Sequence, residues 1–296
     1  MTQAFRISID AGIAELVIDK PPVNALDSVE WFALAGHIDA LGANPEVRVI
    51  VIRAEGRGFC AGVDIKELDA HPERIVAVNG GNYATFKAVH RSPVPVIVAV
   101  HGFVLGGGIG ITGAADIVVA ADCATFALPE VDRGAMGGGA HLQRLFPVQK
   151  VRYLFFTGDK IGAREAERYG FIERVVPRAG LRDAALEIAR KVVADRIEQD
   201  DEAFIRIFKK AVEGLSGQKI VKVSVSEHHL EFATAHADYL RSMVQDAEKL
   251  EVQVIEGASP GSLIVDTEDV SIDASVEKQL EVLEQSVEDA RYGRNT

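Results

Sequence analysis

The sequence lacks the features that mark several classes of protein. Its 296 residues include two cysteines, Cys60 and Cys123, so we expect no disulfide framework and no cysteine-based metal cluster. No apolar run reaches the roughly 18 residues of a membrane-spanning helix. The first ten residues carry neither the cationic segment nor the apolar core of a secretory signal, so we expect a cytoplasmic protein without a membrane anchor.

Positive charge is also scarce. The chain holds 32 Lys and Arg residues against 44 Asp and Glu residues, and the net charge of −12 argues against binding of nucleic acid. Residues 251–296 hold 11 acidic and three basic residues and so contribute −8. The preceding 250 residues carry only the remaining −4. This small net negative charge does not exclude the binding of an anionic ligand.

Strands and helices alternate over the first two-thirds of the chain. A hydrophobic fraction of 48% and 27 glycines suit a globular protein. Apolar runs predict strands at residues 5–10, 13–19, 47–53, 95–101, 116–120, 125–128 and 172–176. Helices are predicted after Asp27 or Ser28 and at residues 79–89, 107–115, 141–146, 148–156, 163–169 and 181–194. The chain is therefore predicted to be an α/β protein with partly parallel sheets.

The strand pattern is expected to stop near residue 198. Residues 204–215 and 228–250 are predicted to be helical, and residues 258–269 have the composition of a linker. A tail helix is predicted from apolar residues at helical spacing, which are Ile272, Val276, Leu280, Leu283 and Val287. This helix would dock on its own protomer or bind a partner. Three parts are thus expected: a core at 1–197, a helical region at 198–253, and an acidic linker with a tail helix at 254–296.

Two glycine-rich loops follow buried strands, one at residues 57–67 and one at 101–110. The G-x-G-x-x-G pattern at 108–113 formally matches a dinucleotide fingerprint. The strand before it is not the first of the chain, however, so close packing in a helix explains these glycines better. Glycines 106–108 can instead present free N–H groups at a helix start. A second amide from the 57–67 loop would complete an oxyanion hole.

These loops resemble the crotonase (enoyl-CoA hydratase/isomerase) superfamily, together with FALPEVDRGAMGGGAHLQRL at 126–145 and IGAREAERYGFIERVVP at 161–177. The resemblance covers residues 5–250. It implies a spiral of ββα units, an acyl-CoA thioester as substrate and no separate cofactor or metal. It also implies a homotrimer or dimer of trimers, with subunit contacts through the region at 198–253.

The resemblance also assigns residues to the site. The amides of Ala61 and Gly107 would form the oxyanion hole for the thioester carbonyl. The channel for coenzyme A would be lined by two segments, which are Val23, Asn24, Ala25 and Leu26 in the first and Ala61, Gly62, Val63, Asp64 and Ile65 in the second.

Two further positions bear on the reaction. Hydratases of the superfamily typically use two glutamates, but the first position is Gly110 here and only the second, Glu130, is present. A site with a single glutamate resembles the enoyl-CoA isomerases of the superfamily. His141 stands where the family usually has a glycine. A catalytic histidine and a packed or surface histidine both remain open.

Three functions remain open at this point. The first is an enzyme of the hydratase/isomerase type that works through a thioester enolate with Glu130 as acid and base. The second follows from Gly110, Glu130 and the segment at 129–145, which also resemble an actinobacterial branch. Its members hydrolyse a C–C bond in cyclic β-keto acyl-CoA intermediates of steroid degradation, and here Glu130 and His141 would divide the base and acid roles. The third is a non-catalytic CoA-binding scaffold. Glu130 beside both hole-forming loops argues against it.

Overall fold

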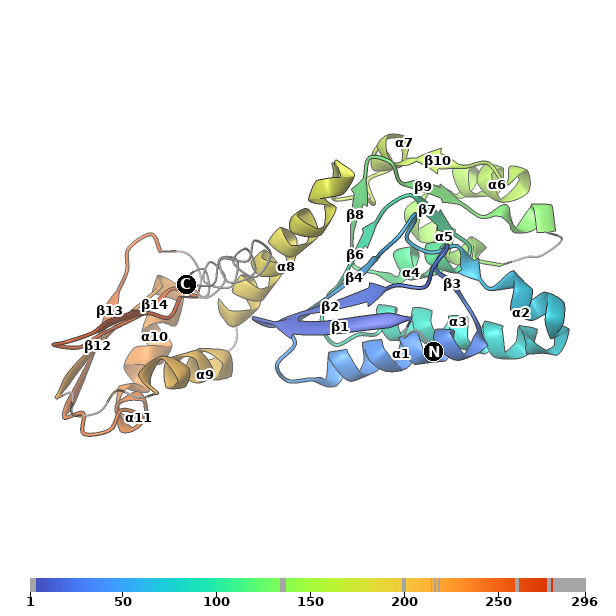
Figure 1. Cartoon of the computed structure of the whole chain (residues 1–296). Coiled ribbons are helices and arrows are strands. Elements are labelled where there is room, and N and C mark those ends of the chain that lie inside the picture. Colours follow the sequence, from blue (N-terminus) through green and yellow to red (C-terminus); the bar gives the residue numbers. More distant parts are fainter. Residues whose placement is uncertain are drawn as a thin grey trace, which may run out of the picture. The chain divides into compact units, whose positions relative to one another are not determined.

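The computed structural model describes residues 4–133, 137–198, 201–213, 215, 217, 219–258, 261–275 and 278. The chain divides into two compact units, Met1–Ala189 and Arg190–Thr296 (Figure 1). Each unit has a hydrophobic core of its own. Among the described helices, none has the length and apolar character needed to cross a membrane.

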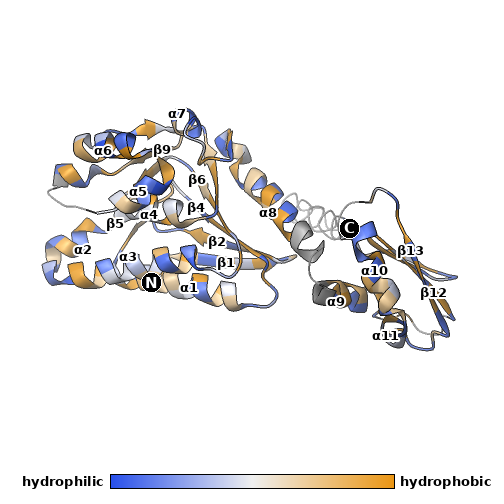
Figure 2. Cartoon of the chain, turned by 180° about the vertical axis from the view of Figure 1, so that it is seen from behind, coloured by the Kyte–Doolittle hydropathy of each residue, from blue (hydrophilic) through white to orange (hydrophobic). Residues whose placement is uncertain are grey.

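A six-stranded sheet forms the centre of the first unit. Its strands lie in the order β1 (Phe5–Asp10), β2 (Ile13–Ile18), β4 (Val49–Ala54), β6 (Val96–Val100), β8 (Ile117–Ala121) and β11 (Arg174–Val176). β1 and β2 form an antiparallel hairpin, and all later pairs are parallel. The parallel strands β4 and β6 are apolar along most of their length (Figure 2), as strands covered on both faces must be. These strands confirm the predicted α/β class.

Short strands follow the long ones and make two smaller sheets. One consists of β10 (Ile161–Gly162), β9 (Thr125–Ala127) and β7 (Phe103–Leu105), and the other of β3 (Ala25–Leu26) and β5 (Gly62–Val63). The chain thus repeats a long strand, a short strand and a helix. These repeats are β2–β3–α1 (Ser28–Ala43), β4–β5–α2 (Ile65–Ala70) and β6–β7–α4 (Gly107–Ala114). The expected spiral of ββα units is confirmed.

The remaining helices of the first unit pack on this framework. They are α3 (Ile75–His90), α5 (Gly139–Leu145), α6 (Val148–Thr157), α7 (Ala163–Glu167) and the first half of α8 (Leu181–Glu198), within which the boundary between the units falls. Short 3₁₀ turns lie at Pro72–Arg74, Pro129–Arg133 and Arg178–Gly180. Asp27 begins α1 with a capping box, in which its side chain accepts the Glu30 amide and Glu30 accepts the Asp27 amide. α1 carries Trp31, Leu34 and Ile38 into the core. The helix predicted after Asp27 or Ser28 is therefore confirmed.

The second unit is an α/β unit and not a helical one. Its sheet has the order β13 (Lys249–Val254), β12 (Ile220–Val225), β14 (Leu263–Asp266) and β15 (Ser271–Asp273). α9 (Asp201–Val212), α10 (Glu227–Ala235) and α11 (Ala237–Ser242) accompany it. The buried core includes Phe204, Phe208, Val223 and Val265.

This unit corrects five expectations. Strands do not stop near residue 198, and the predicted helix at 228–250 gives way to β13 from Lys249. No boundary lies at 253/254, because β14 and β15 belong to the same sheet as β12. Ile272 lies in β15 and not in a tail helix, and the other apolar positions predicted for that helix lie outside the described residues. The division between the units falls at Ala189/Arg190 and not at 197/198.

Candidate active site

The two predicted CoA-binding segments lie side by side. β3 pairs in parallel with β5, so that Ala25 lies opposite Gly62 and Leu26 opposite Val63. The Asp64 amide donates to the Leu26 carbonyl at 2.9 Å, and the Asp64 side chain caps α2 by accepting the Lys66 amide. The structure therefore brings both segments to one place. Their contact with coenzyme A remains a prediction.

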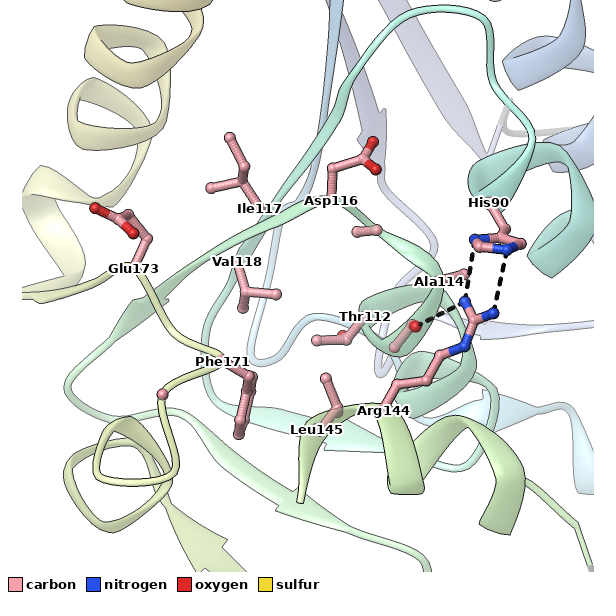
Figure 3. Close-up of a pocket in the computed structure, with 13 residues that line it drawn as sticks. His90, Thr112, Ala114, Asp116, Ile117, Val118, Arg144, Leu145, Phe171 and Glu173 are labelled. Carbon is pink, nitrogen blue, oxygen red and sulfur yellow. Dashed lines mark hydrogen bonds between the residues drawn. The ribbon is translucent and has the colours of Figure 1, made fainter. Parts of the chain in front are cut away.

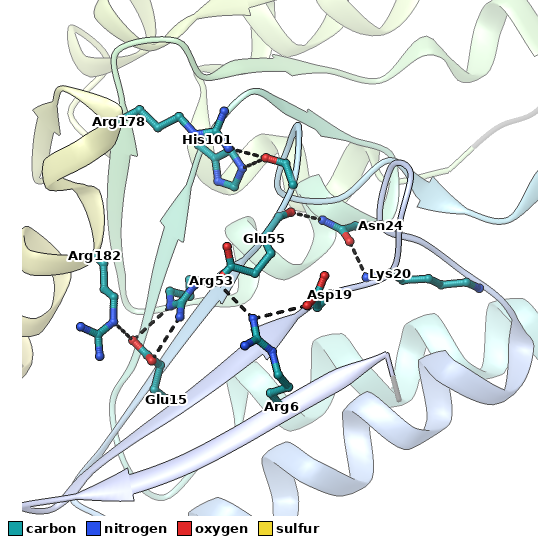
Figure 4. A network of polar contacts seen from close by, with 11 residues as sticks. Arg6, Glu15, Asp19, Lys20, Asn24, Arg53, Glu55, His101, Arg178 and Arg182 are labelled. Carbon is teal, nitrogen blue, oxygen red and sulfur yellow. Dashed lines mark hydrogen bonds and ion pairs between the residues drawn. The ribbon is translucent and has the colours of Figure 1, made fainter. Parts of the chain in front are cut away.

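Asn24 holds the first segment against residues 55–58, which precede the second. Its backbone is in the left-handed region, with φ of 53°, and only 3% of the residue is exposed. Its side-chain amide donates to the carbonyls of Glu55 at 2.8 Å and Gly58 at 2.9 Å, and its oxygen accepts the Lys20 amide at 2.8 Å (Figure 4). This side chain is satisfied by the protein, so Asn24 positions the loop.

An ion-pair network fixes the strands from which these loops emerge (Figure 4). Glu15 of β2 lies 3.1 Å from Arg53 of β4 and 2.8 Å from Arg182. Arg53 also pairs with Glu55 at 2.6 Å, and its hydrogen bond to that carboxylate holds the pKa of Glu55 below its ordinary value. Each carboxylate has a cationic partner, as structural ion pairs do. The network therefore anchors the site and is not itself the reactive centre.

The two glycine-rich loops touch at Gly62 and Gly107. Gly62 has φ of +90°, and a Cβ atom there would lie 3.1 Å from the Gly107 nitrogen. The Leu105 amide donates to the Cys60 carbonyl at 2.9 Å, which joins the loops beside this contact. Because each residue involved follows a strand of the central sheet at its carboxyl end, the loops meet where open α/β sheets bind ligands.

The two predicted oxyanion-hole donors differ in their present partners. Among the described residues, no acceptor pairs with the Gly107 amide, because it lies in the first turn of α4, where helix amides lack intrahelical partners. The Ala61 amide instead donates to the Val23 carbonyl at 3.2 Å. The Gly107 amide is therefore available as a donor, whereas the Ala61 amide already donates a hydrogen bond to the neighbouring segment.

Glu130 lies beside Gly106, the residue before Gly107. It belongs to the 3₁₀ turn Pro129–Arg133, and its Oε1 lies 3.0 Å from the position that a Cβ atom would take at Gly106. Its Oε2 is buried and finds no hydrogen-bond partner among the described residues. Burial raises the pKa of this carboxyl above its ordinary value. Glu130 is thus a poorly solvated acid next to the Gly107 amide.

His141 approaches the same helix from α5. A Cβ atom at Gly113 of α4 would lie 2.5 Å from the His141 carbonyl oxygen, so the two helices pack closely. Its Nδ1 is buried without a partner in the described part of the chain. Burial above all, and then the charge of Arg144 and of His90, lower the pKa of the imidazole. His141 is therefore neutral at pH 7 and can accept a proton.

Aromatic side chains pack against the glycines of α4 and against His141. A Cβ atom at Gly107 would lie 2.6 Å from the Trp31 indole, and one at Gly110 would lie 2.1 Å from the Phe86 ring. The ring of Phe86 lies 4.6 Å from the His141 ring and 6.0 Å from the Trp31 ring. Sequence reasoning did not assign Trp31 or Phe86 to the site. Two glycines three residues apart on one helix face were the available signal, because such a face leaves room for large neighbours.

A pocket of about 470 Å³ lies at the other end of α4 (Figure 3). Its lining includes His90, Thr112, Asp116, Arg144 and Glu173. Arg144 contacts both ring nitrogens of His90 at 3.1 and 3.2 Å and donates to the Gly113 carbonyl at 3.3 Å. The pocket surrounds the residues that follow α4, whereas Glu130 and the free amide lie at its start. It is therefore separate from the candidate active site.

Comparison with known proteins identifies the family. Residues 8–256 match the family model described as enoyl-CoA hydratase/isomerase. The chain belongs to this family. It is an acyl-CoA enzyme of the crotonase type, and the predicted family is confirmed.

Two curated relatives bear the same name, (7aS)-7a-methyl-1,5-dioxo-2,3,5,6,7,7a-hexahydro-1H-indene-carboxyl-CoA hydrolase. The protein from Rhodococcus jostii is 47% identical over 206 residues, which cover 69% of this chain and 78% of the relative. The protein from Mycobacterium tuberculosis is 44% identical over 213 residues, which cover 71% and 84%. The predicted resemblance to the actinobacterial hydrolase branch is confirmed by these relatives.

A solved structure shows the same fold. The enoyl-CoA hydratase of Mycobacterium smegmatis superposes with a TM-score of 0.63 at 26% sequence identity. The match covers 81% of this chain and 90% of that protein. The crotonase fold expected from the sequence is thus confirmed.

Proposed function

We propose that this chain hydrolyses a ring C–C bond in a cyclic β-keto acyl-CoA. The observation that carries this proposal is the pair of ionisable groups in the site: a buried carboxyl at Glu130 and a neutral imidazole at His141, with no carboxylate at Gly110. Two relatives named as hydrolases of a bicyclic dioxo CoA thioester support it. This reaction and the reactions of the hydratase/isomerase type pass through the same kind of intermediate, a thioester enolate.

The reaction consumes one water. His141 takes a proton from the water while the oxygen adds to the carbon of the ring ketone. The bond between that carbon and the carbon next to the thioester then breaks, and its electron pair moves into the thioester to give an enolate. The ketone carbon becomes a carboxylic acid. Protonated Glu130 gives its proton to the enolate carbon. The proton on His141 then passes through solvent to the Glu130 carboxylate, which restores both groups.

The Gly107 amide stabilises the negative oxygen of the enolate in this scheme. A donor aimed at such an oxygen contributes roughly 3 kcal/mol to the stability of the transition state. Glu130 and His141 suit their roles because burial moves their pKa values in opposite directions, up for the acid and down for the base. Both shifts favour the neutral form of the group, which is a carboxyl that can give a proton and an imidazole that can take one.

The test is an assay of the full chain against three substrates in ¹⁸O-labelled water. These are the bicyclic dioxo CoA thioester, a linear 2-enoyl-CoA and a linear 3-enoyl-CoA. Ring opening yields a new carboxylic acid that carries ¹⁸O and can be esterified, whereas hydration yields a labelled alcohol and isomerisation incorporates no label. A labelled carboxylic acid from the bicyclic substrate is the expected product, and its absence would contradict the proposal.

Two variants then test the assigned roles. Glu130→Gln and His141→Ala should each lower kcat for ring opening by about 100-fold or more, because each removes a proton-transfer group. The affinity for a CoA thioester should change little. Isomerisation of a 3-enoyl-CoA that survives His141→Ala but not Glu130→Gln would instead support the single-glutamate isomerase. A non-catalytic scaffold would bind CoA thioesters and convert none of the three.

We further propose that the chain works without a metal or a separate cofactor, in the cytoplasm, as a homotrimer or a dimer of trimers. The family resemblance supports this assembly and this absence of a cofactor.

A further inference from the structure

The ring of Phe86 occupies the space that a side chain at residue 110 would need. The ring belongs to α3, and Gly110 lies buried in the middle of α4. A Cβ atom at Gly110 would lie 2.1 Å from Cζ of Phe86, 2.4 Å from Cε1 and 2.6 Å from Cε2. Side-chain carbons do not approach one another this closely. Residue 110 can therefore carry a side chain only if Phe86 moves or is replaced.

Position 110 matters because of the face of α4 on which it lies. Residues 107 and 110 are three apart in a helix and so face the same side. A carboxylate at 110 would therefore be close to the thioester bound at the Gly107 amide, where it could hold a water. In this chain the ring of Phe86 fills that place. Phe86 also lies edge-on to His141, with an angle of 64° between the rings, so that an imidazole stands beside the filled position.

We propose that Phe86 determines the reaction specificity of the site. Its ring excludes a second carboxylate and the water that such a group would hold, and it leaves His141 as the partner of Glu130. An apolar ring in this place also suits a bulky carbocyclic acyl group better than it suits an ordered water. This inference rests on the proposed ring-opening function, and it assigns the substrate preference of that site to one side chain.

The first test is a double-mutant cycle on thermal stability in the full chain. Phe86→Leu removes the three ring atoms in question and keeps an apolar side chain. Gly110→Ala should lower Tm by about 5 °C in the presence of Phe86, because overpacking strains a buried site. In the Phe86→Leu background the same substitution should change Tm by no more than about 1 °C.

Gly36→Ala is the matched control for this cycle. Gly36 also lies in a helix, α1, but a Cβ atom there would meet no other atom within 4 Å. Its substitution should affect Tm equally in both backgrounds. Equal effects of Gly110→Ala in the two backgrounds would overturn the inference that Phe86 fills this space.

The second test measures specificity. Phe86→Leu combined with Gly110→Glu should hydrate a linear 2-enoyl-CoA at least about 10-fold faster than the unaltered chain and should open the bicyclic substrate more slowly. Gly110→Glu alone should gain no hydration. A hydratase produced by Gly110→Glu alone, or no gain in the double variant, would overturn the assignment of specificity to Phe86.

The two tests also separate this inference from the proposed function. An unaltered chain that fails to open the bicyclic substrate contradicts the proposed function, whereas the stability cycle still decides whether Phe86 blocks position 110. Ring opening by the unaltered chain together with additive Tm changes leaves the proposed function in place and rejects the role of Phe86.

Discussion

Glu130 and His141, the proposed acid and base, both have pKa values that burial shifts. Within the described part of the chain, neither side chain has a charged partner that would hold it in its ionised form. The loss of solvent is the first cause of both pKa shifts, and it favours a protonated carboxyl and a neutral imidazole. Ionisable groups whose pKa is shifted by burial reduce the stability of the fold, because their charged forms are poorly solvated. The burial that would suit Glu130 to proton transfer therefore also lowers the stability of the fold.

Because burial raises the pKa of Glu130, we predict that Glu130→Gln increases the stability of the fold and that this gain depends on pH. The folded state holds the Glu130 proton more tightly than the unfolded state, whose pKa is near the ordinary value of 4.5. The charged carboxyl therefore destabilises the fold increasingly as pH rises from 4.5 through the folded-state value, and not at lower pH. Glu130→Gln should raise Tm at pH 7, and this gain should shrink as pH falls toward 4.

Calorimetry from pH 4 to pH 8 measures this difference. Glu46→Gln serves as the control, because it removes a carboxylate from an exposed position. A Glu130→Gln variant whose Tm difference from the unaltered chain stays constant over this range would show that burial does not perturb the carboxyl.

At the scale of elements, the site depends on two loops that approach one another closely. Gly62 combines a positive φ with a contact to the Gly107 nitrogen, whereas Gly56 has φ of +81° and open space around its Cβ position. Gly62→Ala should therefore displace the Gly107 amide, and kcat/KM for the thioester substrate should fall by about 100-fold. Gly56→Ala should share the backbone strain, with a loss in Tm of about 3 °C, and keep its activity.

Kinetics and thermal melts of both variants check this prediction. Equal activity losses in the two variants would mean that backbone strain alone is responsible. An active Gly62→Ala would mean that the contact between the loops does not position the amide.

The same elements show what the sequence could predict. The strands of the central sheet were predicted to within a few residues, because apolar runs such as VIVIRA and VIVAV are bounded by loop residues. Glu130 and the two glycine-rich loops were assigned to the site by resemblance to a family motif, and His141 was singled out because it departs from that motif. Phe86 was not found, because its role depends on Gly110, which lies in another helix. No local pattern encodes that contact.

The second unit shows where the sequence-based prediction failed. Val221, Val223 and Val225 alternate with Lys222 and Ser224, which is the period of a half-buried strand. This signal was overridden by the helical pattern on either side of it and by the expectation of a helical C-terminal region. A parallel partner strand follows only at Lys249, after two helices, so the pairing that stabilises β12 is not local.

Because the two units have separate hydrophobic cores, we predict that each can unfold without the other. Val223 of β12 is fully buried in the core of the second unit, so Val223→Asp places a charge among apolar side chains. The cost is several kcal/mol, which is comparable with the stability of a small unit. Hydrogen exchange followed by mass spectrometry should then show loss of protection in β12 and β14. Protection should persist in β2 and β4, where Leu16 and Ile52 belong to the other core.

Lys222→Asp is the matched control for this prediction, because Lys222 is the exposed neighbour of Val223 on the same strand. It introduces the same side chain without burying it. Because Lys222 lies opposite Glu251 and Asp266, it should cause at most a small loss of protection in the second unit and none in the first. If Val223→Asp also removes protection from β2 and β4, the two units fold as one cooperative body, since a core that is stable alone would keep its amides protected when the other core opens.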